Sequence, residues 1–329
     1  MNIKDEIWIL SDSRPGTVSQ SIALAEEIGF EYKIINLDYS ILAKLPNCAL
    51  SNSLLRLNKT SRHKFQNLDY LPSFVISAGR KCAPIALFLK KKSENKTKII
   101  QIMKPDLNFN KFDFLILPKH DEVNEQQFPN LITTIGSLSK VNEKHIELER
   151  EKFTNWFSEI KKPKIAVLLG GSSNKTKFEK DSAIKLAKIS SKLAEEMNAI
   201  LLVLNSRRTS EELTKAFSSS LECDFKFYDW RELKDENPYM AILGFADFFI
   251  ITGDSISMIS ECCSTGKPVY IFDEKEISAA KHRLFHRDLI SENYARKLTK
   301  SLNKLENFLA PKLQETKRVA ALIRSLLVK

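Results

Sequence analysis

The chain has 329 residues, of which 43% are hydrophobic, and a formal net charge of +10. This length allows two domains of ordinary size, each with its own core. No stretch approaches the roughly twenty apolar residues that span a bilayer, and the first residues are typical of a strand rather than of a signal peptide. We therefore expect a cytoplasmic protein. The 5 cysteines lack CxxC spacing, which argues against a disulfide framework and a zinc site and predicts reduced thiols.

The positive charge suits a phosphorylated substrate or an anionic lipid surface. The sequence has no RNA-module signature and no basic stripe interleaved with aromatic residues, so we expect no nucleic-acid partner. Residues 296–329 carry nine basic residues against two acidic ones. One apolar helix face in this tail is formed by Val319, Leu322, Ile323, Leu326 and Leu327. Two interpretations stay open: the helix packs on the protein, or it makes peripheral contact with an anionic membrane at the inner membrane face.

Strands and helices alternate along the chain. In the first half, strands are predicted at residues 7–10, 32–37, 74–77, 99–103 and 114–117, and helices at 18–28 and 84–92. The order βαβ predicts a parallel sheet. A charged helix is predicted at 141–160, and the break Lys161-Lys162-Pro163 after it marks the expected domain boundary. The second half repeats the pattern, with strands at 165–169, 200–204 and 246–252.

These elements predict an α/β fold of two Rossmann-like domains facing a cleft, the architecture called GT-B. We expect an N-terminal Rossmann-like domain at residues 1–160, a C-terminal Rossmann-like domain at 161–295 and a helical tail at 296–329; the resemblance described below implies that the first binds the acceptor and the second the nucleotide-sugar donor.

Each of the three strands of the second half ends in a polar turn that precedes a helix. In an open α/β sheet a ligand binds at the carboxyl ends of the strands. Backbone N–H groups at a helix start, fixed guanidinium charge and a carboxylate together suit a nucleoside diphosphate. A single Gly-Gly-Ser-Ser turn is more often only a helix cap, but three converging turns favour a phosphate site. The residues concerned are Gly170, Gly171, Ser172 and Ser173; Ser206, Arg207, Arg208 and Thr209; and Gly253, Asp254, Ser255, Ser257 and Glu261.

The first half has ligand turns of its own. Asp12 follows the first strand and is the candidate general base, with His120 or Asp121 as alternatives because histidine titrates near neutrality. A solvated loop explains His120 equally well. His282 and His286 are four residues apart, but no third ligand is spaced to help them, so we expect no metal site. The candidate acceptor-binding residues are Arg14, Gly16, Gln20, Gly79, Arg80 and Lys104.

Several segments, in order, resemble the mitochondrial-fission "elongated mitochondria" family, whose bacterial members are taken for GT-B glycosyltransferases. They are WILSDSRPGTVSQSIALAEEIG, FVISAGR, FDFLILPKHDEV, VLLGGSS, SRRT and ENPYMAILGFADFFIITGDSISMISE. The likeness extends to about Arg296. The resemblance implies donor-site roles for SRRT, for Asn237 and Tyr239 of NPY, and for Asp254, Ser255, Ser257, Met258 and Glu261 of DSISMISE. The family's first turn is closer to GRPGHENQ, so no role is carried over to residues 17–19.

The predicted function is a metal-independent glycosyltransferase. It would move a sugar from a nucleotide-diphosphate donor, a substrate rather than a cofactor, to a glycan or glycolipid acceptor of the cell envelope, with N–H dipoles and arginines stabilising the leaving group. Two alternatives stay open. One is a nucleotide-sugar epimerase of the same fold. The other is a non-catalytic adaptor that recruits a partner to a membrane, as the family's eukaryotic role suggests, although dense polar side chains at three strand ends favour an enzyme.

Overall fold

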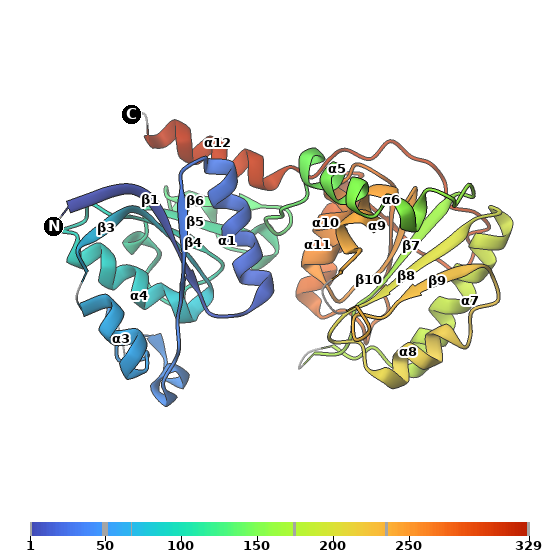
Figure 1. Cartoon of the computed structure of the whole chain (residues 1–329), viewed down its shortest axis with the longest axis horizontal. Helices are drawn as coiled ribbons and strands as arrows, with labels where there is room; N and C mark the ends of the chain where they lie inside the picture. Colours follow the sequence, from blue (N-terminus) through green and yellow to red (C-terminus); the bar gives the residue numbers. More distant parts are fainter. Residues whose placement is uncertain (1, 48–51, 67, 174–175, 234–235, 328–329) are drawn as a thin grey trace. The chain divides into compact units, whose positions relative to one another are not determined.

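The computed structural model describes residues 2–47, 52–66, 68–173, 176–233 and 236–327 (Figure 1). It divides the chain into two compact units: Met1–Lys140 with Gln314–Lys329, and Val141–Leu313. Each unit contains one six-stranded sheet, and all the paired strands are parallel. The predicted α/β class is therefore confirmed in both halves of the chain.

The first sheet has the strand order β2-β1-β3-β4-β5-β6. Side chains of a strand alternate between the two faces of its sheet, and β1 shows the consequence. Ile7 and Ile9 join a core with α1 and α12, whereas Trp8 and Leu10 join a core with α3 and α4 on the other face. The bounds are β1 Asn2–Ser11, α1 Pro15–Ile28, β2 Tyr32–Asn36, α3 Lys59–Gln66, β3 Tyr70–Ala78, α4 Gly79–Lys92, β4 Lys98–Ile102, β5 Phe114–Pro118, β6 Leu131–Thr134 and α12 Glu315–Leu327.

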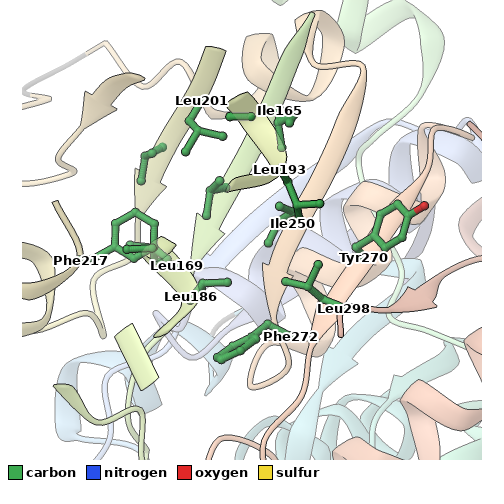
Figure 2. Close-up of a cluster of buried hydrophobic side chains, with 14 of the residues drawn as sticks. Ile165, Leu169, Leu186, Leu193, Leu201, Phe217, Ile250, Tyr270, Phe272 and Leu298 are labelled. Atoms are coloured by element: carbon green, nitrogen blue, oxygen red, sulfur yellow. The ribbon is translucent and has the colours of Figure 1, made fainter. Parts of the chain in front are cut away.

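The second sheet has the order β12-β11-β10-β7-β8-β9. Figure 2 shows one of its faces, where apolar side chains of β7, β8, β10 and β11 pack with Leu186 and Leu193 of α7 and Phe217 of α8. The bounds are α5 Glu143–Lys152, α6 Thr154–Phe157, β7 Lys164–Leu169, α7 Lys180–Glu196, β8 Ile200–Asn205, α8 Glu211–Ser218, β9 Phe225–Tyr228, α9 Tyr239–Phe245, β10 Phe248–Thr252, α10 Ile256–Ser264, β11 Val269–Phe272, α11 Ala280–Ser291 and β12 Arg296–Lys297.

The boundary between the units lies between residues 140 and 141, not at the expected 160/161. The charged segment before the Lys-Lys-Pro break forms two helices, α5 and α6, and both pack within the second unit. The Arg150 guanidinium lies 5.0 Å from the Phe245 ring centroid of α9. Trp156 stacks on Tyr228 of β9 with ring centroids 5.7 Å apart. Such aromatic contacts are not visible in the local charge pattern from which the boundary was predicted.

The tail departs from the expected helix at 296–329, because the helix begins only at Glu315. The chain before it packs on the second unit: Leu305 and Phe308 are buried in its core, and the Glu306 N–H donates to the Tyr270 hydroxyl (2.8 Å). The α12 helix belongs instead to the first unit, where Val319, Ala320 and Ile323 are buried against the core that contains α1. The apolar face of α12 therefore packs on the protein, whereas Leu322 and Leu326 remain exposed.

Shortening Ile323 to Val is expected to lower the free energy of unfolding of the first unit by about 1 kcal/mol, because it leaves a small cavity in a fully buried site. Leu322→Ala is the matched control, since Leu322 lies on the exposed side of the same helix. Chemical unfolding of both variants measures the difference. Equal losses of stability would contradict the assigned orientation of α12.

Two further features bear on the expectations from composition. The structure has free thiols at Cys82, Cys223, Cys262 and Cys263, and Cys48 lies outside the described residues. Within the described part of the chain, none of the helices combines the length and the apolar character needed to cross a bilayer.

Candidate functional site

Three polar turns of the second unit meet at one edge of its sheet, because β10, β7 and β8 are neighbours. Pairing sets Leu168 of β7 beside Ile251 of β10 and beside Leu204 of β8, so the three strands end at the same level. The Gly170 N–H donates to Thr252 Oγ1 (2.7 Å), which joins the β7 turn to the end of β10. The predicted convergence of the three turns is therefore confirmed, and Thr252 is a member of the site that the sequence did not indicate.

Asp254 holds the three turns together. Its side chain is fully buried, and its Oδ2 accepts the Gly171 N–H (3.0 Å) and pairs with Nη2 of Arg208 (2.8 Å). Its Oδ1 is buried without a hydrogen-bond partner among the described residues. The guanidinium of Arg208 also donates to the Gly171 carbonyl (3.4 Å). The carboxylate is thus a brace for the turns, and it neutralises one of the two adjacent arginines.

The two glycines of the β7 turn are required by this close approach. A Cβ on Gly170 would lie 2.0 Å from Asp254 Oδ1, and a Cβ on Gly171 would lie 2.0 Å from the Arg208 carbonyl oxygen. The serines that follow are engaged locally: Ser172 Oγ accepts the Phe178 N–H (3.1 Å), and the Ser173 N–H donates to the Thr176 carbonyl (2.8 Å). These four residues therefore shape the loop.

The four residues of the β8 turn have different contacts. Thr209 is buried and donates through its hydroxyl to the carbonyls of Leu169 (3.1 Å) and Gly170, and its Oγ1 accepts the Ser206 N–H (2.9 Å). The Thr209 side chain therefore joins the β8 turn to the end of β7. Arg207 and Arg208 are both exposed, but Arg208 is paired with Asp254, whereas Arg207 forms no ion pair with the residues that the structure describes. Of the SRRT residues, Arg207 is therefore the cation that a ligand can reach without breaking an internal contact.

The third turn leads into α10, and Ser255 is the N-cap of this helix. Ser255 Oγ accepts the Met258 N–H (3.5 Å), and Ser257 lies in the first turn of the helix. A helix N-terminus carries partial positive charge, which favours a bound anion nearby. Ser255 and Met258 therefore have a structural role as well as a place at the site.

Glu261 is one and a half turns into α10 and accepts a hydrogen bond from the Tyr239 hydroxyl. Burial raises the pKa of Glu261 to about 7, and the Tyr239 hydrogen bond opposes this shift only in part. Burial likewise raises the pKa of Tyr239. Asn237 caps the start of α9 by accepting the Tyr239 N–H (3.0 Å). The NPY and DSISMISE motifs thus meet through the Tyr239–Glu261 pair.

Lys267 binds the carboxyl end of α9. Its Nζ donates to the carbonyls of Leu243 (3.1 Å), Gly244 (2.7 Å) and Ala246 (2.6 Å) at the end of α9. These carbonyls have no partner within their helix, and a cation there is favoured by the helix dipole. Burial lowers the pKa of Lys267 to about 8.

Buried His286, which the sequence suggested only as a metal ligand, forms a pair with half-buried Asp273 next to the third turn. His286 Nδ1 is 3.3 Å from Asp273 Oδ2. A Cβ on Gly253 would lie 2.8 Å from the His286 ring and 2.5 Å from Ser278 Oγ, so the turn needs a glycine there. Burial lowers the pKa of His282, one turn earlier. Within the described ranges no group of three or more His, Cys, Asp or Glu residues is placed to hold a metal, and metal independence stays a prediction.

The first unit gathers its candidates at the corresponding edge. Asp12 follows β1, and its side chain is 2% exposed. Its Oδ2 accepts from Nε of Arg14 (2.5 Å), and its Oδ1 accepts from the Thr17 hydroxyl (2.8 Å). Arg14 lies over Gly79, where an added Cβ would come 2.9 Å from Nη2. Asp12 can act as a base only if the guanidinium of Arg14 moves away from its carboxylate.

The other turns of this edge follow β3, β4 and β5. Buried Gln101, which the sequence did not indicate, donates through Nε2 to the carbonyls of Gly79 (3.3 Å) and Met103 (3.0 Å). Nζ of Lys104 donates to the carbonyl of Asp121 (2.9 Å). Lys104 and Asp121 therefore meet, and His120 is buried beside Asp121 in a short 3₁₀ turn.

Two predicted acceptor residues of the β1 turn differ in their surroundings. Gln20 is buried and donates to the carbonyl of Gly16 (3.1 Å), whereas a Cβ on Gly16 would meet nothing within 4 Å. The carbonyl of Arg80 accepts from Asn47 Nδ2 (2.8 Å). Gln20 thus stabilises the first turn of α1, and Gly16 leaves open space above it.

The family model described as "Mitochondrial fission ELM1" matches residues 15–327 of the chain. The chain is 32% identical to the uncharacterized protein RP120 of Rickettsia prowazekii over 352 aligned positions, which cover 97% of each protein. It is 26% identical to mitochondrial fission protein ELM1 of Arabidopsis thaliana over 77% of this chain and 63% of that protein.

Solved structures are similar in fold at much lower identity. The UDP-GlcNAc 2-epimerase of Methanocaldococcus jannaschii, solved with UDP-GlcNAc and UDP, superposes with a TM-score of 0.51 at 11% identity and covers 99% of this chain and 100% of its own. The similarity confirms the predicted GT-B-like fold.

Proposed function

Since the chain belongs to the mitochondrial fission ELM1 family, we propose that it is a glycosyltransferase. It moves a sugar from a nucleotide-diphosphate donor, held by the second unit, to a glycan or glycolipid acceptor, held by the first. The observation that carries the proposal is the edge where the turns after β7, β8 and β10 are bonded to one another around Asp254. A protein that only recruits a partner has no need of such a preorganised polar edge.

The second unit supplies three groups that suit a diphosphate leaving group. Arg207 offers a positive charge that no described residue neutralises. The start of α10 offers backbone N–H groups and the positive end of a helix dipole. Gly170 and Gly171 keep Cβ atoms out of the turn. Together these groups stabilise negative charge that develops on the leaving phosphate.

Glu261 is the candidate ligand for the ribose. Removing a charged carboxylate from water costs free energy unless a hydrogen-bond donor or a cation binds it. A carboxylate can accept from two neighbouring hydroxyls at once, and Tyr239 fixes the orientation of one of its oxygens. The acceptor hydroxyl would lie on the first unit near Asp12, Arg80 and Lys104, with Asp12, His120 or Asp121 as base.

Arg207→Ala is expected to weaken the binding of UDP or UDP-GlcNAc by about tenfold or more, because a charge-assisted hydrogen bond is lost. The melting temperature of the free protein should hardly change, since the side chain is exposed. Isothermal titration with each nucleotide measures the affinity. Arg287→Ala, which removes another exposed arginine, is the control. Equal affinity of wild type and the Arg207 variant would contradict the phosphate role.

A nucleotide-sugar epimerase is the second candidate, and the shared fold of the Methanocaldococcus enzyme favours it. The two reactions differ in their need for an acceptor. Incubation with UDP-GlcNAc alone, followed by analysis of the sugar, separates them: an epimerase changes the donor without any second substrate. Absence of nucleotide binding by the wild type would instead favour the adaptor.

A further inference from the structure

The chain between β2 and the end of α3 exposes large aliphatic side chains on one surface. This surface, named here the aliphatic patch, consists of Ile41, Leu42, Leu45 and Leu55. Ile41 is 85% exposed. The two parts of the patch are bonded to each other, because the Ser40 N–H donates to the Arg56 carbonyl (2.7 Å) and the Ser40 hydroxyl donates to the Leu55 carbonyl (3.1 Å). Grouped exposed side chains of this size mark an interaction surface rather than ordinary surface scatter.

The segment that carries the patch has a net positive charge. Residues 38–69 contain five Lys or Arg residues, of which Arg56 is buried, and two acidic residues, Asp38 and Asp69, at the two ends of the segment. Lys44, Lys59 and Lys64 are exposed, and none of them forms an ion pair with any residue that the structure describes. Arg62 lies against the patch itself, since its Nη2 donates to the Leu55 carbonyl (3.3 Å). The surface therefore combines aliphatic side chains with uncompensated cations.

The patch is held firmly to the first unit. Arg56 and Asn47 are both buried, and Nη2 of Arg56 donates to Oδ1 of Asn47 (2.7 Å). Asn47 Nδ2 in turn donates to the carbonyls of Arg80 (2.8 Å) and Pro105 (2.5 Å), which follow β3 and β4. In Figure 1 the blue segment that precedes α3 in the chain lies beside that helix, and α12 covers the other face of the sheet. The patch is thus attached to the edge that carries the acceptor candidates.

We propose that the aliphatic patch docks on the surface of an anionic phospholipid bilayer. The four aliphatic side chains enter the boundary between headgroups and acyl chains, and the lysines lie against lipid phosphates. An anionic bilayer matches both properties of the surface. A second copy of the chain does not, because a symmetric contact would bring two positive surfaces together. The proposal goes beyond glycosyl transfer and does not depend on a nucleotide at the second unit.

The test is co-sedimentation of the full chain with vesicles of equal parts phosphatidylcholine and phosphatidylglycerol, compared with phosphatidylcholine alone. Wild type is expected to bind the anionic vesicles, and more weakly as salt rises. Ile41→Ser with Leu42→Ser and Leu45→Ser should lower the partition coefficient by about tenfold or more. Lys44→Gln, Lys59→Gln and Lys64→Gln should each lower it by about fivefold. If the triple variant does not fold, Ile41→Ser alone is measured instead, and it should also lower the partition coefficient.

Matched controls separate this surface from others. Leu309→Ser removes the most exposed leucine of the second unit, and Leu322→Ser with Leu326→Ser removes the exposed leucines of α12; all should bind vesicles as wild type does. Arg207→Ala should also bind normally, so a failure of the donor site is distinguished from a failure of the patch. The proposal is overturned if wild type does not bind, if binding follows Leu322 and Leu326, or if Ile41→Ser instead abolishes self-association or capture of an acidic protein.

Discussion

Replacing Arg208 with Ala is expected to lower the free energy of unfolding of the second unit by about 3 kcal/mol, because it leaves a buried carboxylate without its cation. The Asp254 side chain is 0% exposed, and its Oδ1 already lacks a partner among the described residues. We expect the lower end of the usual range, since Arg208 itself is 40% exposed and water reaches it. Chemical unfolding measures the loss.

Two matched variants test whether the unpaired Asp254 carboxylate causes the loss of stability in Arg208→Ala. Arg207→Ala removes the neighbouring exposed guanidinium and should change stability by less than about 0.5 kcal/mol. Combining Arg208→Ala with Asp254→Asn removes the unpaired charge and should restore most of the loss. A double variant that is as unstable as Arg208→Ala alone would show that the guanidinium acts by packing rather than by charge.

The stability of the second unit should also fall as the pH rises from about 4.5 to about 7, through the ionisation of Glu261. The folded pKa of about 7 lies above the reference value of 4.5, so the folded state holds the proton more tightly. The protonated Glu261 makes its full contribution to the stability of the folded state below pH 4.5, and this contribution is lost as the pH rises through 7. Its upper limit is about 3 kcal/mol, because a tenfold difference in proton affinity between the folded and unfolded states corresponds to about 1.36 kcal/mol.

Glu261→Gln isolates this effect from other ionisations. The amide still accepts from Tyr239 but cannot ionise, so the variant should match wild type at pH 4.5 and be more stable than wild type at pH 8. At the same pH it should bind UDP less tightly, because a neutral acceptor bonds the ribose more weakly. A stability difference that does not depend on pH would refute the ionisation, and unchanged affinity would refute the ribose contact.

Local sequence patterns were enough to predict β1 to β5, β7, β8 and β10 and the polar turns at their ends, but they did not predict β6, β9, β11 and β12. β7, β8 and β10 read directly as apolar runs that end in Gly, Ser or Arg, and parallel strands must place those ends at one edge. The Ser255 cap of α10 is also a local feature, because a cap depends on residues three apart. The family resemblance extended this to the NPY and DSISMISE motifs.

Interactions between distant residues could not be predicted in the same way. Arg207 and Arg208 are adjacent and chemically identical, yet only Arg208 meets Asp254, which is 46 residues away along the chain. Tyr239 and Glu261 also form a hydrogen bond although they are 22 residues apart along the chain. A side chain's burial and charge partner follow from which elements pack against it, and the local sequence does not contain that information.

The α/β class, the parallel pairing of the strands and the polar ends of the strands follow from local sequence, because hydrophobic periodicity and turn chemistry are local properties. The tertiary structure alone decided that α5 and α6 belong with the second unit and α12 with the first. It also decided that the apolar face of α12 is covered while Ile41 is not. The α12 helix and the segment that contains Ile41 are both basic and aliphatic. Only their packing shows which apolar face completes a core and which stays exposed.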